Sequence, residues 1–202
     1  MPRIQGVPLD THNPLLRFVF WVVNRRFGQP VEPLQGYARN GSVLAAMTAL
    51  EIGMERARRL DLRLKQLAEL RVAALVGCRF CLDIGSALIA KLGVPAAQVR
   101  ELNDYETSAA FSPLEKLVLR YADRMTETPV DVGDDLVAML REHMDEPQLV
   151  ELTAAIAHEN LRARMNHALG YGAAGFSNGA ACALPAQRKL PEQESHTLQR
   201  VS

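Results

Sequence analysis

The length and the charge balance of the chain exclude several classes of protein. At 202 residues the chain can bury one good-sized core without disulfide or metal staples, so we expect one domain. Lys plus Arg and Asp plus Glu both total 23, so no basic field favours a nucleic-acid partner. The cysteine count is 3, which is odd, and two of the cysteines are only three positions apart, which argues against a secreted disulfide framework and favours a reducing, cytoplasmic location.

Apolar periodicity predicts an all-α fold of about seven or eight helices. The sequence lacks the sustained alternation typical of strands, and Ala, Leu, Glu and Arg recur at helical spacing. Pro14 starts the first helix and Gly28 ends it, after an N-terminal extension over residues 1–13. We then expect a loop through Gly36. The further predicted helices cover residues 42–60, 61–77, 80–92, 95–102, 112–126, 134–144 and 147–169.

Local signals mark several boundaries of this domain. Residues 112–115 combine a capping serine, a first-turn proline and a glutamate three positions after the cap, which indicates a helix start. The longest predicted helix carries Asn160 on its apolar stripe, so we expect Asn160 to face the core. The domain should span residues 14–185, and the polar residues 186–202 should form a frayed tail.

The apolar run over residues 18–23 invites comparison with a targeting segment. It is too short to span a bilayer, and its basic pair, Arg25 and Arg26, follows the run, whereas a signal peptide places basic residues before it. We therefore interpret the run as part of a buried or interfacial helix and expect no membrane partner.

The pair Cys78 and Cys81, with two residues between them, is the strongest chemical signal in the chain. At a helix start the free amides and the dipole stabilise a thiolate, and this spacing can close a disulfide. Gly77 allows a tight turn, which predicts an exposed Cys78 at the rim and a sheltered Cys81 on the apolar stripe. A pair of buried structural thiols is the alternative. A zinc site lacks the four ligands it needs, so we expect no metal.

Three segments resemble the carboxymuconolactone decarboxylase and alkylhydroperoxidase D-like superfamily. They are residues 64–83 around the cysteine pair, residues 112–115 with the helix that follows, and residues 159–170, so that the resemblance covers roughly residues 40–172. It implies an all-α alkylhydroperoxidase D-like domain that assembles as a homo-oligomer, such as a dimer, trimer or hexamer, and that needs no cofactor. In the peroxidase branch, it implies that Cys81 attacks the peroxide and that Cys78 resolves the sulfenic acid as a disulfide, which a dithiol reductant later reduces.

Two positions depart from the peroxidase pattern of that superfamily. The relay histidine four residues after Cys81 is replaced by Gly85, and the relay glutamate twelve residues before Cys78 is replaced by Gln66. Glu69 lies three residues after Gln66 on nearly the same helix face and can substitute for the glutamate, or it is a solvated surface carboxylate. His158 is the candidate replacement base, or it is a structurally satisfied histidine.

Further polar residues are candidates for substrate binding. Arg162 and Arg164 can bind a carboxylate or pair with neighbouring acids, and Asp83 can act in the site or simply favour the positive end of its helix. Cys182 belongs to a segment of small residues that we expect to pack on the surface. The complete set of candidate substrate-binding residues is Gln66, Asp83, Asn160, Arg162 and Arg164.

Three functions are compatible with these residues. The first is a thiol-dependent peroxidase or disulfide reductase, with a hydroperoxide or disulfide as substrate and Cys81, Cys78, Glu69 and His158 as catalytic residues. The second is a cofactor-free, carboxymuconolactone decarboxylase-like lyase acting on a small carboxylic acid, which depends on Arg162 or Arg164 and not on the cysteines. The third is a non-enzymatic helical scaffold with structural or redox-sensing cysteines.

Overall fold

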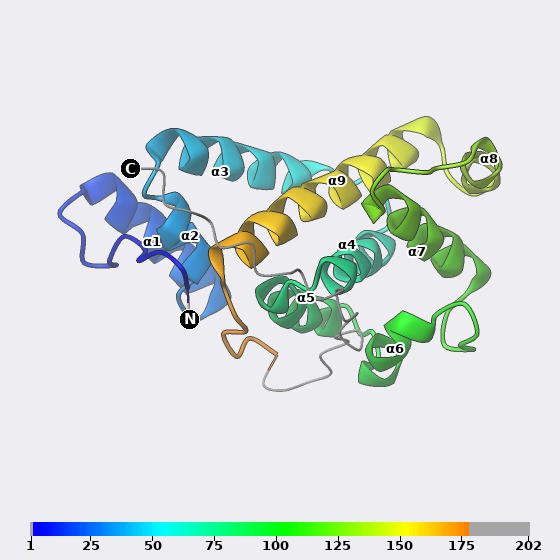
Figure 1. Cartoon of the computed structure of the whole chain (residues 1–202), viewed down its shortest axis with the longest axis horizontal. Helices are drawn as coiled ribbons and strands as arrows, with labels where there is room; N and C mark the ends of the chain where they lie inside the picture. The colour runs from blue at the N-terminus through cyan, green and yellow to red at the C-terminus, as the bar shows by residue number, and fades with distance from the viewer. Residues whose placement is uncertain (1, 178–202) are drawn as a thin grey trace, which may run out of the picture.

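The computed structural model describes residues 2–177, and every regular element in that range is helical, so the predicted all-α fold is confirmed. Figure 1 shows the elements packed around one another in a single body. In chain order they are α1 (Pro14–Phe27), α2 (Glu32–Tyr37), α3 (Gly41–Arg56), α4 (Leu62–Val76), α5 (Arg79–Lys91), α6 (Ala96–Arg100), the 3-10 helix η1 (Glu101–Asp104), α7 (Pro113–Thr126), α8 (Asp134–Arg141) and α9 (Glu146–Leu169).

The helix α4 lies at the centre of the molecule, where α5, α7 and α9 pack against it (Figure 1). Most of its residues are buried, the charged Lys65 and Arg71 among them, and Leu67, Val72 and Ala74 have no exposed surface. Alanines on this helix let its neighbours approach closely, and each fully buried leucine contributes about 1.5–3 kcal/mol of transfer free energy. The cysteine pair follows directly after this helix, so the most buried element of the fold positions it.

The helix α9 crosses α3 and α4 and brings a row of polar side chains into the core. His158, Glu159 and Asn166 are buried. Asn160 is only half-buried, so the prediction that it faces the core is wrong. Its Nδ2 donates to Thr126 Oγ1 and to its own helix backbone. Asn160 does not face the core because each helix residue is rotated by about 100° from the one before it, and Glu159 points inward.

Helix boundaries set by local caps lie where the sequence predicts them, whereas other boundaries differ from the prediction. The first helix spans Pro14–Phe27 with Gly28 as its cap, as predicted. Residues 112–115 form the expected capping box. The predicted loop through Gly36 is partly wrong, because α2 begins at Glu32 with Pro33 in its first turn. The next helix is capped by Asn40, not by Ser42, and it ends at Arg56 before the predicted end.

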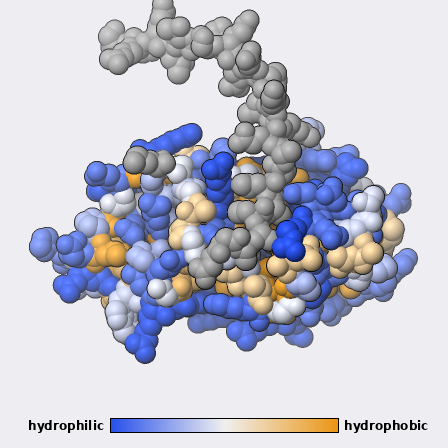
Figure 2. Space-filling model, turned by 90° about the horizontal axis from the view of Figure 1, so that it is seen from below, coloured by the Kyte–Doolittle hydropathy of each residue, from blue (hydrophilic) through white to orange (hydrophobic). Residues whose placement is uncertain are grey.

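The outer face of α1 is apolar. Figure 2 shows hydrophobic surface at the end of the molecule that carries this helix. Phe20 is the buried side chain of α1, whereas Phe18, Trp21 and Val22 are exposed. In residues 2–177 no helix combines the length and the apolar character needed to cross a membrane.

Candidate active site

A tight turn between α4 and α5 positions the cysteine pair. Gly77 ends α4 with a left-handed φ of 76°, a conformation that disfavours any residue with a Cβ. Cys78 then becomes the N-cap of α5, and the backbone N–H of Cys81 donates to Cys78 Sγ at 3.2 Å. The Cys78 sulfur therefore takes the position in which a serine or aspartate oxygen normally caps a helix.

Both thiols are free and buried, with exposures of 1% for Cys78 and 4% for Cys81. The prediction of an exposed Cys78 is therefore wrong. The turn at Gly77 directs the chain back under α4, and Cys78 packs in the same core cluster as Phe80 and Tyr171. The segment that supplies Tyr171 is far away in sequence, so the turn geometry alone did not reveal the burial.

The two sulfurs have different environments. Hydrogen bonding with Cys81, through both its thiol and its backbone N–H, lowers the pKa of Cys78 although burial opposes this shift. The hydrogen bond to Cys78, burial and the negative Glu159 raise the pKa of Cys81 well above the usual value. Because the helix start donates to one sulfur only, the pair favours a thiolate on Cys78 with a proton on Cys81.

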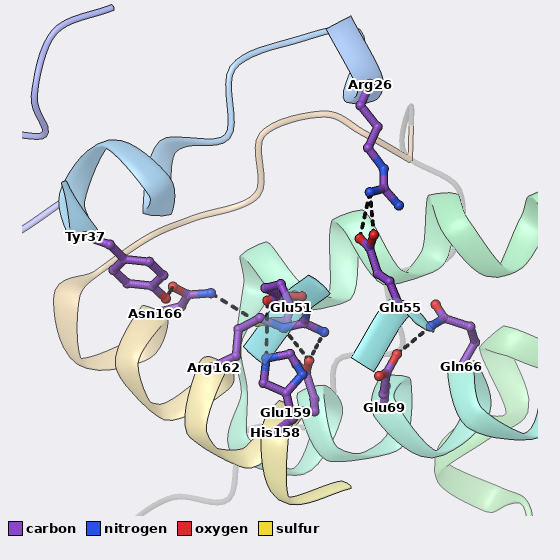
Figure 3. A network of polar contacts seen from close by, with 11 residues as sticks. Arg26, Tyr37, Glu51, Glu55, Gln66, Glu69, His158, Glu159, Arg162 and Asn166 are labelled. Carbon is purple, nitrogen blue, oxygen red and sulfur yellow. Dashed lines mark hydrogen bonds and ion pairs between the residues drawn. The ribbon is translucent and has the colours of Figure 1, made fainter. Parts of the chain in front are cut away.

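Cys81 is linked to α2 through a buried amide. Asn166 Nδ2 lies 3.4 Å from Cys81 Sγ, and the Tyr37 hydroxyl donates to Asn166 Oδ1 at 2.5 Å (Figure 3). Burial, and then the nearby Cys81, raises the pKa of Tyr37, so the phenol keeps its proton. Sequence reasoning assigned no role to Tyr37 or Asn166. A polar residue on the inward face of α9 was the available signal, since a buried amide needs partners.

A cluster of charged side chains lies on α3 and α9 near Tyr37 and Asn166 (Figure 3). Arg162 donates to Glu159 on its own helix and to Glu51 Oε1 and Oε2 at 3.0 and 3.2 Å (Figure 3). His158 Nε2 lies 3.3 Å from Glu51 Oε1. Although burial opposes it, Arg162 together with His158 lowers the pKa of Glu51 to about 2. Glu51 was missed as a site residue because its pairing with Arg162 joins distant helices, whereas Glu159 lies three residues before Arg162 on α9.

Glu69 and Gln66 extend from α4 next to this cluster. Gln66 Nε2 donates to Glu69 Oε2 at 2.5 Å (Figure 3). Burial raises the pKa of Glu69 to about 7, and the negative Glu159 adds to this effect while Arg162 opposes it. A carboxyl group with this pKa exchanges protons readily at neutral pH. The position of Glu69 thus agrees with its predicted proton-transfer role, which stays a prediction.

The remaining candidates lie outside this cluster. Arg164 is exposed, and it donates to Asn160 Oδ1 and to the carbonyl of Thr126 at the end of α7. Asp83 accepts hydrogen bonds from residues 174–177. Cys182 lies outside the described residues. In residues 2–177 no group of three or more His, Cys, Asp or Glu side chains is placed to hold a metal ion.

Comparison with known proteins identifies the family. The sequence pattern of the Carboxymuconolactone decarboxylase family matches residues 42–124. Uncharacterized protein YnjA of Escherichia coli strain K12 is 31% identical over 189 residues, which cover 93% of this chain and 98% of YnjA. The chain belongs to the carboxymuconolactone decarboxylase family. The resemblance seen around the cysteine pair is thereby confirmed.

Solved structures share the fold of this carboxymuconolactone decarboxylase family member. An uncharacterized peroxidase-related protein from Ralstonia eutropha JMP134, described as an alkylhydroperoxidase AhpD core, has a TM-score of 0.78 at 17% identity, covering 87% of this chain and 94% of its own. The debrominase Bmp8 has a TM-score of 0.76 at 18% identity, covering 88% and 95%. At these identities the similarity shows the alkylhydroperoxidase D-like fold.

Proposed function

We propose that this protein is a thiol-dependent oxidoreductase that reduces a hydroperoxide or a disulfide through the pair Cys78 and Cys81. The observation that carries the proposal is the capping position of Cys78, whose sulfur accepts the Cys81 N–H at 3.2 Å while Cys81 keeps its proton. A lowered thiol pKa at a helix start is the property that activates redox cysteines.

The reaction with a hydroperoxide balances within the pair and one external reductant. The Cys78 thiolate attacks the distal peroxide oxygen, the O–O bond breaks, and the alkoxide leaves as an alcohol after taking a proton, which Glu69 can supply near neutral pH. The Cys81 thiol then attacks the sulfenic sulfur, and water leaves as the disulfide forms. A dithiol reductant exchanges with this disulfide and is itself oxidised.

This division of roles is the reverse of the one that the family resemblance implies, in which Cys81 attacks and Cys78 resolves. The two assignments predict different trapped species. In Cys81→Ser protein, one equivalent of hydroperoxide should leave a sulfenic acid on Cys78 that dimedone labels, and mass spectrometry locates the label. A dimedone label on Cys81 in Cys78→Ser protein, at the rate of the intact pair, would restore the family assignment. No label in either variant would end the proposal.

The lyase alternative receives less support from the geometry. It needs an arginine that is free to bind the substrate carboxylate, but Arg162 is already held by Glu51 and Glu159. Arg164 is exposed and donates to groups at the junction of α9 and α7. The alternatives separate in one experiment, because Cys78→Ala with Cys81→Ala should abolish peroxide reduction but leave a decarboxylase intact.

A further inference from the structure

The proposed chemistry requires access that the closed structure does not provide. A peroxide oxygen or a reductant sulfur must contact the attacked sulfur directly, whereas Cys78 is 1% exposed and Cys81 is 4% exposed. Two surface pockets of about 480 and 310 Å³ lie elsewhere, and neither is lined by a cysteine. Some part of the cover over the pair must therefore move during turnover.

The segment over residues 171–177, which we call the strap, packs against the core cluster that contains the pair. It follows Gly170, the left-handed cap of α9. Tyr171 belongs to the core cluster that contains both cysteines, and Phe176 packs against that cluster. The Phe176 ring packs nearly perpendicular to the ring of Phe80, which lies between the two cysteines in sequence, with 5.8 Å between ring centroids. The Phe176 ring also packs against Phe27 of α1, with 6.3 Å between ring centroids.

A single carboxylate holds the far end of the strap. Asp83 Oδ2 accepts the backbone N–H groups of Ala174, Gly175 and Phe176 at 2.8, 2.7 and 3.0 Å. Asp83 Oδ1 accepts the N–H of Ser177 at 2.9 Å and its hydroxyl at 2.6 Å. Consecutive amides that converge on one anion form a strong, charge-assisted attachment.

Between Tyr171 and Phe176 the strap is weakly held. Residues 173–175 are exposed, and the Gln29 side chain adds one hydrogen bond, to the carbonyl of Ala174 at 3.3 Å. Asp83 itself is buried in the first turns of α5, two residues after Cys81. A segment whose middle is exposed and whose far end depends on one carboxylate opens locally before the core unfolds. The anchor is thus built into the helix that carries the redox pair.

We propose that residues 171–177 form a strap that covers the cysteine pair, latched by Asp83 and by the ring of Phe176, and that its release admits substrate and reductant. The purpose of the strap rests on the proposed redox function. The barrier to access does not depend on that function, because the strap hinders any small reagent that reacts with thiols. Asp83 is then a positioning residue for the strap and not a substrate ligand.

The test measures how fast iodoacetamide alkylates the reduced full-length protein at fixed pH, with each cysteine quantified by mass spectrometry. Phe176→Ala removes the ring without altering α5, and Asp83→Asn weakens the latch while keeping its shape. Matched controls are Phe18→Ala and Asp135→Asn, at exposed positions. Loss of a charge-assisted anchor should raise the alkylation rate about tenfold or more, and the controls should not change it.

Amide hydrogen exchange of the same proteins separates local opening from unfolding. If the strap opens locally, amide exchange is faster in residues 171–177 while the amides of α4 keep their protection. Unchanged alkylation in both latch variants would overturn the proposal, as would faster alkylation accompanied by equal loss of protection in α4. A strap that behaves as predicted in a protein that reduces no hydroperoxide or disulfide would leave the latch standing and contradict the proposed function alone.

Discussion

At the scale of single residues, the balance of burial and charge around Glu69 decides how the site handles protons. Burial favours the neutral carboxyl, the negative Glu159 adds to this, and Arg162 opposes it, which together bring the pKa to about 7. The neighbouring Glu51 accepts hydrogen bonds from Arg162 and lies next to His158, and both lower its pKa to about 2. One cluster therefore contains a permanent anion and a group that titrates at neutral pH.

Replacing Glu69 tests this balance through stability. A carboxyl whose pKa is raised in the folded state stabilises the fold at low pH, and this contribution is lost as pH rises through about 7. The Glu69→Gln variant cannot ionise at this position, so it lacks this loss. Between pH 5 and pH 8 the free energy of unfolding of the variant should therefore rise by about 2 to 3 kcal/mol relative to that of the wild type. Urea unfolding at both pH values measures the difference. A constant difference across this range would show that Glu69 is ionised throughout.

Asn166 joins Cys81 to Tyr37 inside the core. Tyr37→Phe leaves Asn166 Oδ1 buried without its 2.5 Å donor, which should cost about 1–3 kcal/mol in urea unfolding. Tyr121→Phe is the matched control, because Thr153, which contacts the Tyr121 hydroxyl, also donates to the carbonyl of Leu149. Equal losses in the two variants would mean that the buried amide finds another partner.

At the scale of elements, the connection between α3 and α4 explains where α3 stops. Lys65 Nζ donates to the carbonyls of Met54 and Ala57 and to Glu151 Oε1 at 2.7, 3.1 and 2.9 Å. Glu151 Oε2 accepts the N–H groups of Arg59 and Leu60. Side chains of α4 and α9 thus satisfy the backbone that a longer helix would satisfy itself. The helix predicted to reach residue 60 ends four residues earlier for this reason.

Breaking that connection should be costly. Lys65→Met leaves Glu151 as an unpaired charge, buried at 5% exposure, and should reduce the free energy of unfolding by about 3–5 kcal/mol. Lys91→Met, at an exposed position of α5, should change stability by less than about 0.5 kcal/mol. Chemical denaturation of both variants checks this. A small loss of unfolding free energy for Lys65→Met would show that protonation or hydration of Glu151 costs little.

At the scale of the whole molecule, features with local causes were predictable and features with distant causes were not. Pro14, the capping box over residues 112–115 and Gly77 each determine a boundary from neighbouring residues, and the structure agrees. Cys78 is buried in a core cluster that also contains Tyr171, about ninety residues away. The partners of Arg162 lie on α3 as well as on its own helix. Such pairings arise from packing, which one sequence does not encode in any short pattern.

The assembly and the location of the molecule stay predictions. The family resemblance implies a homo-oligomer, and Phe18, Trp21 and Val22 are exposed on the apolar outer face of α1. Sedimentation equilibrium would give the mass in solution. A dimer, trimer or hexamer would agree with the resemblance, and a monomer at all concentrations would contradict it.

The central claim is that Cys78 and Cys81 form a redox pair. The most direct measurement treats the reduced protein with one equivalent of hydroperoxide and follows its mass, then digests it with trypsin without reduction. Because cleavage after Arg79 separates the two cysteines, the account predicts that residues 72–79 and 80–91 remain joined by a disulfide, with the loss of two hydrogen atoms. Separate peptides carrying free thiols, with the hydroperoxide unconsumed, would contradict it.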